Sequence, residues 1–285
     1  MKIKILISSS SGLDYIPHPN TISIMHDIIK YSDEEEYVDY VELKSEAFYN
    51  RLKYDTRNIP VVLPATMEDI RKDIDEALKE FDFVIIIIPA TGIVDYLDNA
   101  NDAIIGLENK VRIIPSNLVG YPLANMALEI DKAIKAKEDL DEVITSFSKS
   151  DKESATYFYS PLKDFVIAYD ENVSDVQFFK HDTKGLLYEL KCSTLIQLKL
   201  HDDNHQIEEM FSRYLKAAMD SSGVPFILYS SEFSQYNEYL SSKFTTIYKK
   251  IRKVKSYPLP PSIGAIIGAN VIGIGFVRKI SNREK

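Results

Sequence analysis

Cysteine is nearly absent from this chain, which has one, Cys192, among 285 residues. A single cysteine cannot form an intramolecular disulfide, so the fold has to depend on a hydrophobic core. The 45% hydrophobic content is sufficient for such a core, and the length allows two domains of ordinary size. No charged-then-apolar segment with a small-residue cleavage site opens the sequence, and we therefore expect a cytoplasmic protein.

Long apolar runs and an excess of positive charge are also missing. The run Val84 to Ile88 is far shorter than the roughly 20 apolar residues that a bilayer requires, so we expect no transmembrane segment. The net charge of −9 argues against nucleic-acid binding, which draws its affinity from clustered lysine and arginine. The basic run at 249–255 is a local exception that fits a solvated face better than a contact with an acidic partner or an anionic lipid surface.

Three uniformly apolar segments predict buried strands in the first half of the chain: Ile3 to Ile7, Phe83 to Ile88 and Val111 to Ile114. None alternates between apolar and polar residues, as a half-exposed antiparallel strand would. Helical patterns separate them, at 45–53 with Ser45 as a cap and at 67–81 with Thr66 as a cap. This order predicts a mostly parallel sheet with helices on both faces, which binds ligands beyond the carboxyl ends of its strands.

The character of the sequence changes near residue 150, after a further helical pattern at 122–137. We therefore expect an α/β fold in two domains, with the parallel sheet in residues 1–150 and an α+β domain in residues 151–285. The patterns of this second part are aromatic and β-branched strands at 156–170, 186–200 and 225–230, a helix at 207–219, and an apolar, strand-like run at 264–280.

Four serines and a glycine, Ser8 to Gly12, follow the first apolar strand. Such a segment can hold a phosphate, contact a carboxylate or another small polar group, or form an ordinary polar turn. A phosphate loop usually has several glycines that open a helix, often with a lysine, whereas this segment has one glycine and no lysine after it. The glycine-rich run at 264–275 comes last in the chain, so close backbone packing explains it better than a dinucleotide fingerprint.

Patterns typical of catalysis or metal binding are missing from the sequence as well. The five histidines show no HExxH or cysteine–histidine spacing, and the pair His201 and His205 fits a polar turn better than a metal site. Cys192 has no identifiable base near it in sequence, and no GxSxG motif occurs. The acidic run at 33–37 is expected to be a solvated loop. We therefore predict no enzyme, no cofactor and no metal.

The order of these segments resembles the DegV family of bacterial lipid-binding proteins over nearly the whole chain. The resemblance rests on the opening KILISSSSGL, on DEEEYVDYVELKSEAFYNRL, on LPAT, VIIIIP and VRIIPSNLVGYPLA, and on the closing IIGANVIGIGFV. It implies a fatty acid with its tail buried between two α/β domains, no catalysis, and in some members presentation of the carboxylate to a separate kinase that makes acyl phosphate. The serine segment would then shape a turn beside a lipid cleft and hold no phosphate.

This chain departs from the family pattern where the carboxylate is usually held. The family's Thr-Ser-Gln-Pro-Ser is Val61 to Ala65 here, its Ser-Ser-x-Leu-Ser-Gly-Thr-Tyr is Pro89 to Tyr96, and the histidine of its Gly-Ala-His is Asn270. The resemblance implies a ligand site made of Ser9, Ser10, Val61, Val62, Leu63, Ala90, Thr91, Ile93, Ser116 and Asn270.

The expected function is binding of a long-chain fatty acid or a related lipid in an interdomain cleft, by a carrier or presenting protein. A buried carboxylate costs several kcal/mol unless it is paired, whereas each buried methylene contributes about 0.8 kcal/mol, so the tail should govern binding. Two alternatives stay open. One is a ligand-free paralogue that acts as an interaction or regulatory subunit. The other is an enzyme acting on a small metabolite, which is supported only by analogy at the level of the fold.

Overall fold

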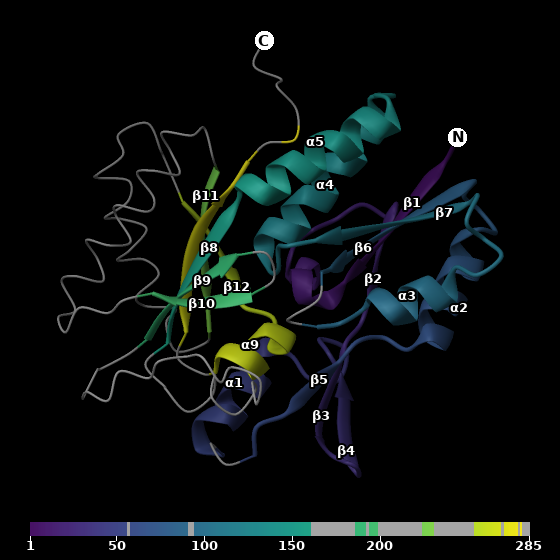
Figure 1. Cartoon of the computed structure of the whole chain (residues 1–285). Coiled ribbons are helices and arrows are strands. Elements are labelled where there is room, and N and C mark those ends of the chain that lie inside the picture. Colours follow the sequence, from purple (N-terminus) through teal and green to yellow (C-terminus); the bar gives the residue numbers. More distant parts are fainter. Residues whose placement is uncertain are drawn as a thin grey trace.

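The computed structural model describes residues 1–55, 58–90, 94–160, 186–191, 194–198, 224–230, 254–268, 271–278 and 280. A parallel sheet forms the centre of the first part of the chain, in the strand order β2-β1-β6-β7 (Figure 1). Its strands are β1 (Ile3–Ser8), β2 (Ile22–Met25), β6 (Phe83–Pro89) and β7 (Val111–Ser116). The three apolar segments are therefore parallel neighbours, as the sequence predicts.

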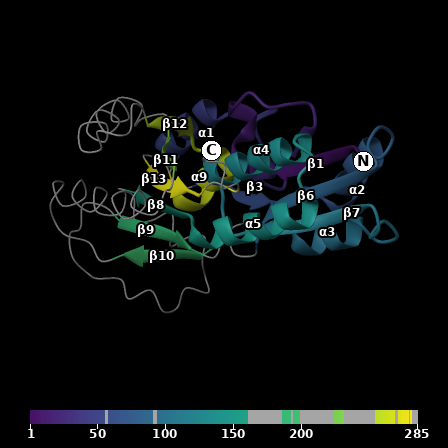
Figure 2. The ribbon, with the colours of Figure 1, turned by 90° about the horizontal axis from the view of Figure 1, so that it is seen from above.

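Helices cover both faces of this sheet (Figure 2). α4 (Tyr121–Lys135) and α5 (Leu140–Glu153) share one core cluster with Ile85 and Ile87 of β6. α2 (Met67–Ala77) and α3 (Leu97–Ala103) share the other with Ile86 and Ile88. Because successive strand side chains point to opposite faces, a strand that is buried on both faces has to be apolar throughout.

Of the two residues predicted to cap helices, Thr66 does so and Ser45 does not. Thr66 is the N-cap of α2, where its side chain accepts a hydrogen bond from the backbone N–H of Asp69 at 3.1 Å, as predicted. Ser45 is not a cap, because α1 (Ser45–Tyr54) begins at Ser45 itself and Lys44 takes the N-cap position. The Ser45 hydroxyl donates instead to the backbone carbonyl of Leu259 at 3.0 Å, which no local pattern could indicate.

A second sheet has the strand order β10-β9-β8-β13-β11-β12 and is antiparallel except for the pair β11 and β12. It confirms strands at 156–160, 186–191, 194–198 and 225–229 within the expected segments, whereas residues 161–170, 192–193, 199–200 and the helix expected at 207–219 lie outside the described residues. The strands are β8 (Ala155–Ser160), β9 (Leu186–Lys191), β10 (Thr194–Leu198), β11 (Val224–Tyr229), β12 (Lys255–Pro258) and β13 (Ile272–Val277).

A small antiparallel sheet, which the sequence analysis did not predict, joins β3 (Ile28–Ser32) to β4 (Glu35–Val38) and β5 (Val61–Leu63). The acidic run at 33–37 is therefore not a loop throughout, since β4 begins at Glu35. Glu35 accepts hydrogen bonds from both terminal nitrogens of Arg51 in α1, the shorter at 2.6 Å. The positive charge that pairs with the acidic strand thus comes from Arg51 in α1, 16 residues away in sequence, and not from a neighbouring residue.

The run from 264 to 280 is not strand-like throughout, because its first part belongs to helix α9 (Pro261–Ile267). Proline suits the first position of a helix, and Gly268 follows the last helical residue with a φ of 93°, which favours glycine. The interpretation of the glycines as close packing is confirmed at Gly264, where an added Cβ would lie 2.3 Å from the Tyr49 hydroxyl.

Helix α9 lies beside α1 although the two are more than 200 residues apart in sequence (Figure 1). It also contacts β3, β5 and the short 3-10 helix η1 (Ser9–Ser11). The C-terminal part of the chain therefore completes the packing of the N-terminal part. Among the described residues, no helix combines the length and the apolar character needed to cross a bilayer.

Candidate functional site

The serine segment forms a buried turn at the carboxyl end of β1. Ser8 caps η1 by accepting a hydrogen bond from the Ser10 backbone N–H at 3.1 Å, and Gly12 ends the turn with a φ of 67°. All four serines, Ser8 to Ser11, are buried. Short polar side chains fit this position because the tight turn places their hydroxyl groups within reach of backbone N–H groups.

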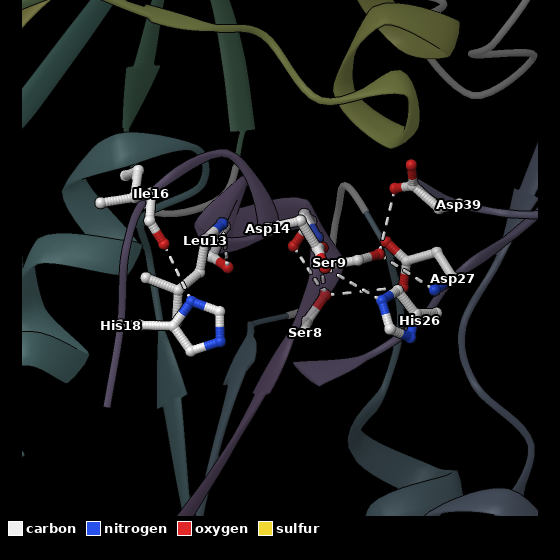
Figure 3. Close-up of polar contacts among 11 residues, drawn as sticks. Ser8, Ser9, Leu13, Asp14, Ile16, His18, His26, Asp27 and Asp39 are labelled. Carbon is white, nitrogen blue, oxygen red and sulfur yellow. Dashed lines mark hydrogen bonds and ion pairs between the residues drawn. The ribbon is translucent and has the colours of Figure 1, made fainter. Parts of the chain in front are cut away.

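The hydroxyl groups of this turn bind acidic residues (Figure 3). Ser9 donates to Asp39 Oδ2 at 3.0 Å and accepts from the Asp27 backbone N–H at 3.0 Å. Ser8 and Ser10 share a hydrogen bond at 2.8 Å. Two carboxyl groups beside the turn would repel a phosphate, so the geometry agrees with the interpretation that the serines hold none.

Asp27 and Asp39 form a buried acid pair that the sequence analysis missed. Asp27 lies between β2 and β3 and is 0% exposed, whereas Asp39 directly follows β4 and is 1% exposed. Burial raises the pKa of Asp27 to about 6, although the hydroxyl groups of Tyr96, Ser9 and Ser262 oppose the rise. Burial, together with the nearby Asp27 carboxyl, raises the pKa of Asp39 to about 8. The available signal in the sequence was a single aspartate inside the apolar stretch ISIMHDII.

An ion pair between His26 and Asp14 flanks the acid pair, with 3.2 Å between His26 Nε2 and Asp14 Oδ1. Burial lowers the pKa of His26, but the hydrogen bond with Asp14 and the charges of Asp14, Asp39 and Asp27 outweigh burial, and the pKa is raised overall. Three buried atoms, Asp27 Oδ2, Asp39 Oδ1 and Ser262 Oγ, have no hydrogen-bond partner among the described residues.

The predicted apolar residues of β5 do not all face the same way. Val61 is 51% exposed and Leu63 is 40% exposed, whereas Val62 between them is 5% exposed and belongs to the core. Alternation of side chains along a strand is the reason. Val61 and Leu63 therefore face solvent on one side of β5, whereas Val62 packs in the core on the other side.

Ala90 and Ser116 lie together at the carboxyl ends of β6 and β7, where the Ala90 backbone N–H donates to the Ser116 carbonyl at 2.6 Å. The Ser116 hydroxyl donates to the carboxylate of Asp151, which also accepts from the Asn117 backbone N–H at 3.0 Å. The parallel sheet thus brings Ser9, Ser10, Ala90 and Ser116 to one edge.

Several predicted positions lie outside the described residues: Thr91, Ile93, Cys192, His201, His205, Asn270 and most of the basic run at 249–255. Where the structure does describe the chain, no group of three or more histidine, cysteine, aspartate or glutamate side chains is arranged to hold a metal ion.

Comparison with solved structures places this fold among DegV proteins. A fatty acid binding DegV family protein from Streptococcus agalactiae aligns with a TM-score of 0.85 at 13% identity, over 98% of this chain and 99% of that one. A stearic acid-binding protein from Eubacterium ventriosum gives 0.82 at 14% identity over 98% and 99% of the two chains. The fatty acid binding protein DegV from Bacillus subtilis gives 0.81 at 17% identity over 98% and 100%.

The sequence comparisons identify the family directly. No curated protein matches the sequence. The family model described as "Uncharacterised protein, DegV family" matches residues 2–162, which is more than half of the chain. The protein therefore belongs to the DegV family.

Proposed function

We propose that this protein binds a long-chain fatty acid or a related lipid and carries or presents it without catalysing a reaction. The observation that carries the proposal is the match of the whole fold, over 98% of the chain, to proteins described as binding fatty acids. A further family member with this fold, from Eubacterium eligens, is loaded with heptadecanoic acid. The scarcity of cysteine suits a cytoplasmic carrier.

The acyl tail supplies most of the affinity in this proposal. The tail lies in a cleft between a domain of residues 1–150 and a domain of residues 151–285. The exposed apolar side chains of Val61 and Leu63 support a mouth that favours a tail over a charged group. The proposed contacts are those expected from the sequence: Ser9, Ser10, Val61, Val62, Leu63, Ala90, Thr91, Ile93, Ser116 and Asn270.

Presentation of the head group to a separate kinase-like protein is part of the proposal. A carrier that buries the tail and leaves the head group near the surface can offer the carboxylate to a partner without releasing the lipid. The absence of a recognisable catalytic motif in the sequence supports a division of labour in which the partner performs the chemistry.

Native mass spectrometry of the protein expressed in a bacterium tests lipid binding directly. We expect a mass above that of the chain, lost under denaturing conditions, and a lipid identified after organic extraction. Calorimetry with added long-chain fatty acid then tests binding to delipidated protein. A chain mass without lipid, together with no binding heat, would contradict the proposal.

One observation favours the second candidate, a ligand-free interaction or regulatory subunit. The hydroxyl groups of Ser9, Ser10 and Ser116 already have hydrogen-bond partners inside the protein. A head group would have to replace these partners or use other residues. The same two measurements separate the candidates, because a regulatory paralogue carries no lipid and takes up none.

A further inference from the structure

The acid pair lies where the N-terminal and C-terminal parts of the chain meet. Asp27 and Asp39 approach from two different loops and are both anchored to the Ser9 hydroxyl. Ser262, the second residue of α9, lies near both carboxyl groups and is 0% exposed. Figure 3 shows the two carboxyl groups beside the end of β1, with the ribbon of α9 on the Asp39 side.

The hydrogen bonds of this cluster do not satisfy two ionised carboxylates. The single hydroxyl hydrogen of Ser9 is used on Asp39, and the Tyr96 hydroxyl donates to Asp27 Oδ1. Asp27 Oδ2 and Asp39 Oδ1 have no hydrogen-bond partner among the described residues. The nearby Ser262 hydroxyl has a single hydrogen, which can serve only one of the two carboxyl groups. Two like charges that act on each other and have unsatisfied oxygens are strongly unfavourable in a buried site. One proton on either carboxyl group removes a charge and supplies a donor.

We propose that Asp27 and Asp39 together hold one proton in the folded protein at neutral pH, and that this proton keeps helix α9 packed against the end of the parallel sheet. Loss of this proton leaves two negative charges near Ser262, and their repulsion weakens the packing of α9. The protein thereby contains a pH-sensitive latch between its C-terminal helix and its N-terminal part. This latch does not depend on the identity of the ligand.

The other contacts of α9 explain why the latch acts on this helix. The Ser45 hydroxyl donates to the carbonyl of Leu259, just before α9, and Tyr49 packs against Gly264. These contacts carry no charge, so they do not vary with pH in the neutral range. The acid pair adds to this interface carboxyl groups whose charge changes in the neutral range.

Several titratable groups face the pair from the surrounding elements. Asp14 and Asp27 act on Asp39 as like charges, whereas His26 acts on Asp27 with the opposite charge. His26 is already engaged by Asp14 at 3.2 Å and so neutralises the pair only in part. Tyr15, Tyr49 and Tyr96 have pKa values raised above the ordinary value, so they stay neutral across the range that matters.

The sign of the pH dependence follows from the raised pKa values of about 6 and about 8. A carboxyl whose pKa is higher in the folded state than in the unfolded state stabilises the fold at low pH and loses that contribution as pH rises through the folded value. The latch is therefore strongest at acidic pH, weakens as pH rises through the neutral range, and has lost its proton above about pH 8.

Hydrogen exchange of the α9 peptide, read by mass spectrometry and corrected for the intrinsic effect of pH, tests the latch. We expect the opening constant of α9 to rise at least about tenfold between pH 6 and pH 9, which corresponds to one pKa unit of coupling. The variant Asp39→Asn has no titrating group at this position and should show a change of less than about threefold.

Asp102→Asn is the matched control, because Asp102 is exposed on α3 and should leave the wild-type dependence unchanged. Amides of β6 report global opening in the same samples. If Asp39→Asn does not fold, carbon-13 titration of the aspartate carboxyl groups in the wild-type protein replaces it, with at least one of the pair expected to titrate above pH 6. Titration of both carboxyl groups below pH 5, or an unchanged pH dependence in Asp39→Asn, would overturn the proposal.

Discussion

Val61 is the residue at which the family resemblance implies a threonine, and the structure changes the expected cost of restoring it. An added hydroxyl in a buried site would need a hydrogen-bond partner to avoid a desolvation cost. At 51% exposure on β5, the added hydroxyl can bind water instead. The substitution is therefore a test of ligand binding that leaves the free energy of unfolding nearly unchanged.

Val61→Thr should tighten binding of an ionised long-chain fatty acid by about 0.5–1.5 kcal/mol, the net value of one hydrogen bond. Isothermal titration calorimetry at a pH where the acid is ionised measures the change. Val41→Thr is the matched control, since Val41 is also exposed and lies outside the proposed site. Equal or weaker binding by Val61→Thr would show that the head group lies elsewhere.

The affinity should also depend little on the charge of the head group, because apolar residues occupy the positions where donors are usual. A fatty acid and its methyl ester, compared by calorimetry, should differ by less than about 3 kcal/mol. A larger difference would indicate a strong charged-group clamp and would contradict the tail-governed site.

Gly264→Ala should destabilise the protein by about 1–3 kcal/mol, the usual cost of overpacking. The new Cβ would lie 2.3 Å from the hydroxyl oxygen of Tyr49, which is itself buried. Thermal and urea unfolding measure the loss. In a Tyr49→Leu background the same substitution should cost less, and equal costs in both backgrounds would rule out this contact as the cause.

At the scale of elements, α1 and α2 show that a serine or threonine near a helix start can have two different roles. Thr66 binds the N–H of Asp69, three residues later, which is a local interaction. Ser45 binds the carbonyl of Leu259 and the hydroxyl of Tyr15. The capping role of Thr66 can be predicted from neighbouring residues. The role of Ser45 depends on residues that are distant in sequence and come close only in the folded protein.

Thr66→Ala should therefore lower the free energy of unfolding by about 1 kcal/mol, whereas Thr66→Ser should keep nearly all of it because the cap oxygen remains. Urea unfolding followed by circular dichroism measures both variants. A loss of similar size in Thr66→Ser would mean that the methyl group, not the cap, stabilises α2.

At the scale of the whole molecule, a boundary in the sequence does not coincide with a boundary in the packing. The sequence changes character near residue 150, in the last turn of α5 and just before β8. However, α9 returns from the C-terminal part to contact α1, η1, β3 and β5. The N-terminal segment therefore lacks part of its own core when it is separated from the rest of the chain.

A fragment of residues 1–153 should accordingly be much less stable than the full chain and should bind a dye that recognises exposed apolar surface. The buried side chain of Tyr49 in α1 would lose its contacts with Gly264 and Pro260. Thermal unfolding of the fragment beside the full chain measures the difference. A fragment that unfolds cooperatively at the temperature of the full chain would contradict this account.

Much of the fold was predictable from local pattern. The apolar runs of β1, β6 and β7 predict neighbouring parallel strands because a strand buried on both faces can carry no polar stripe. The amphipathic spacing of α2 and the threonine before it predict a capped helix. The candidate site was accessible mainly through the family resemblance, since its serines belong to no motif that the chemistry alone would identify.

By itself, therefore, the sequence determined strands β1, β6 and β7, the covering helices α2 and α4, and most strands of the second sheet, since each follows from a short apolar run or from the spacing of apolar residues. It did not predict β2, α3, α5 or β12. Only the tertiary structure decided that α9 is a helix, because a run of seven residues that is buried all round shows no period. Only the tertiary structure also brought Ser9 to Asp39, 30 residues away, and Ser45 to Leu259, 214 residues away. Partners at such separations meet through the packing of whole elements, and no local pattern encodes them.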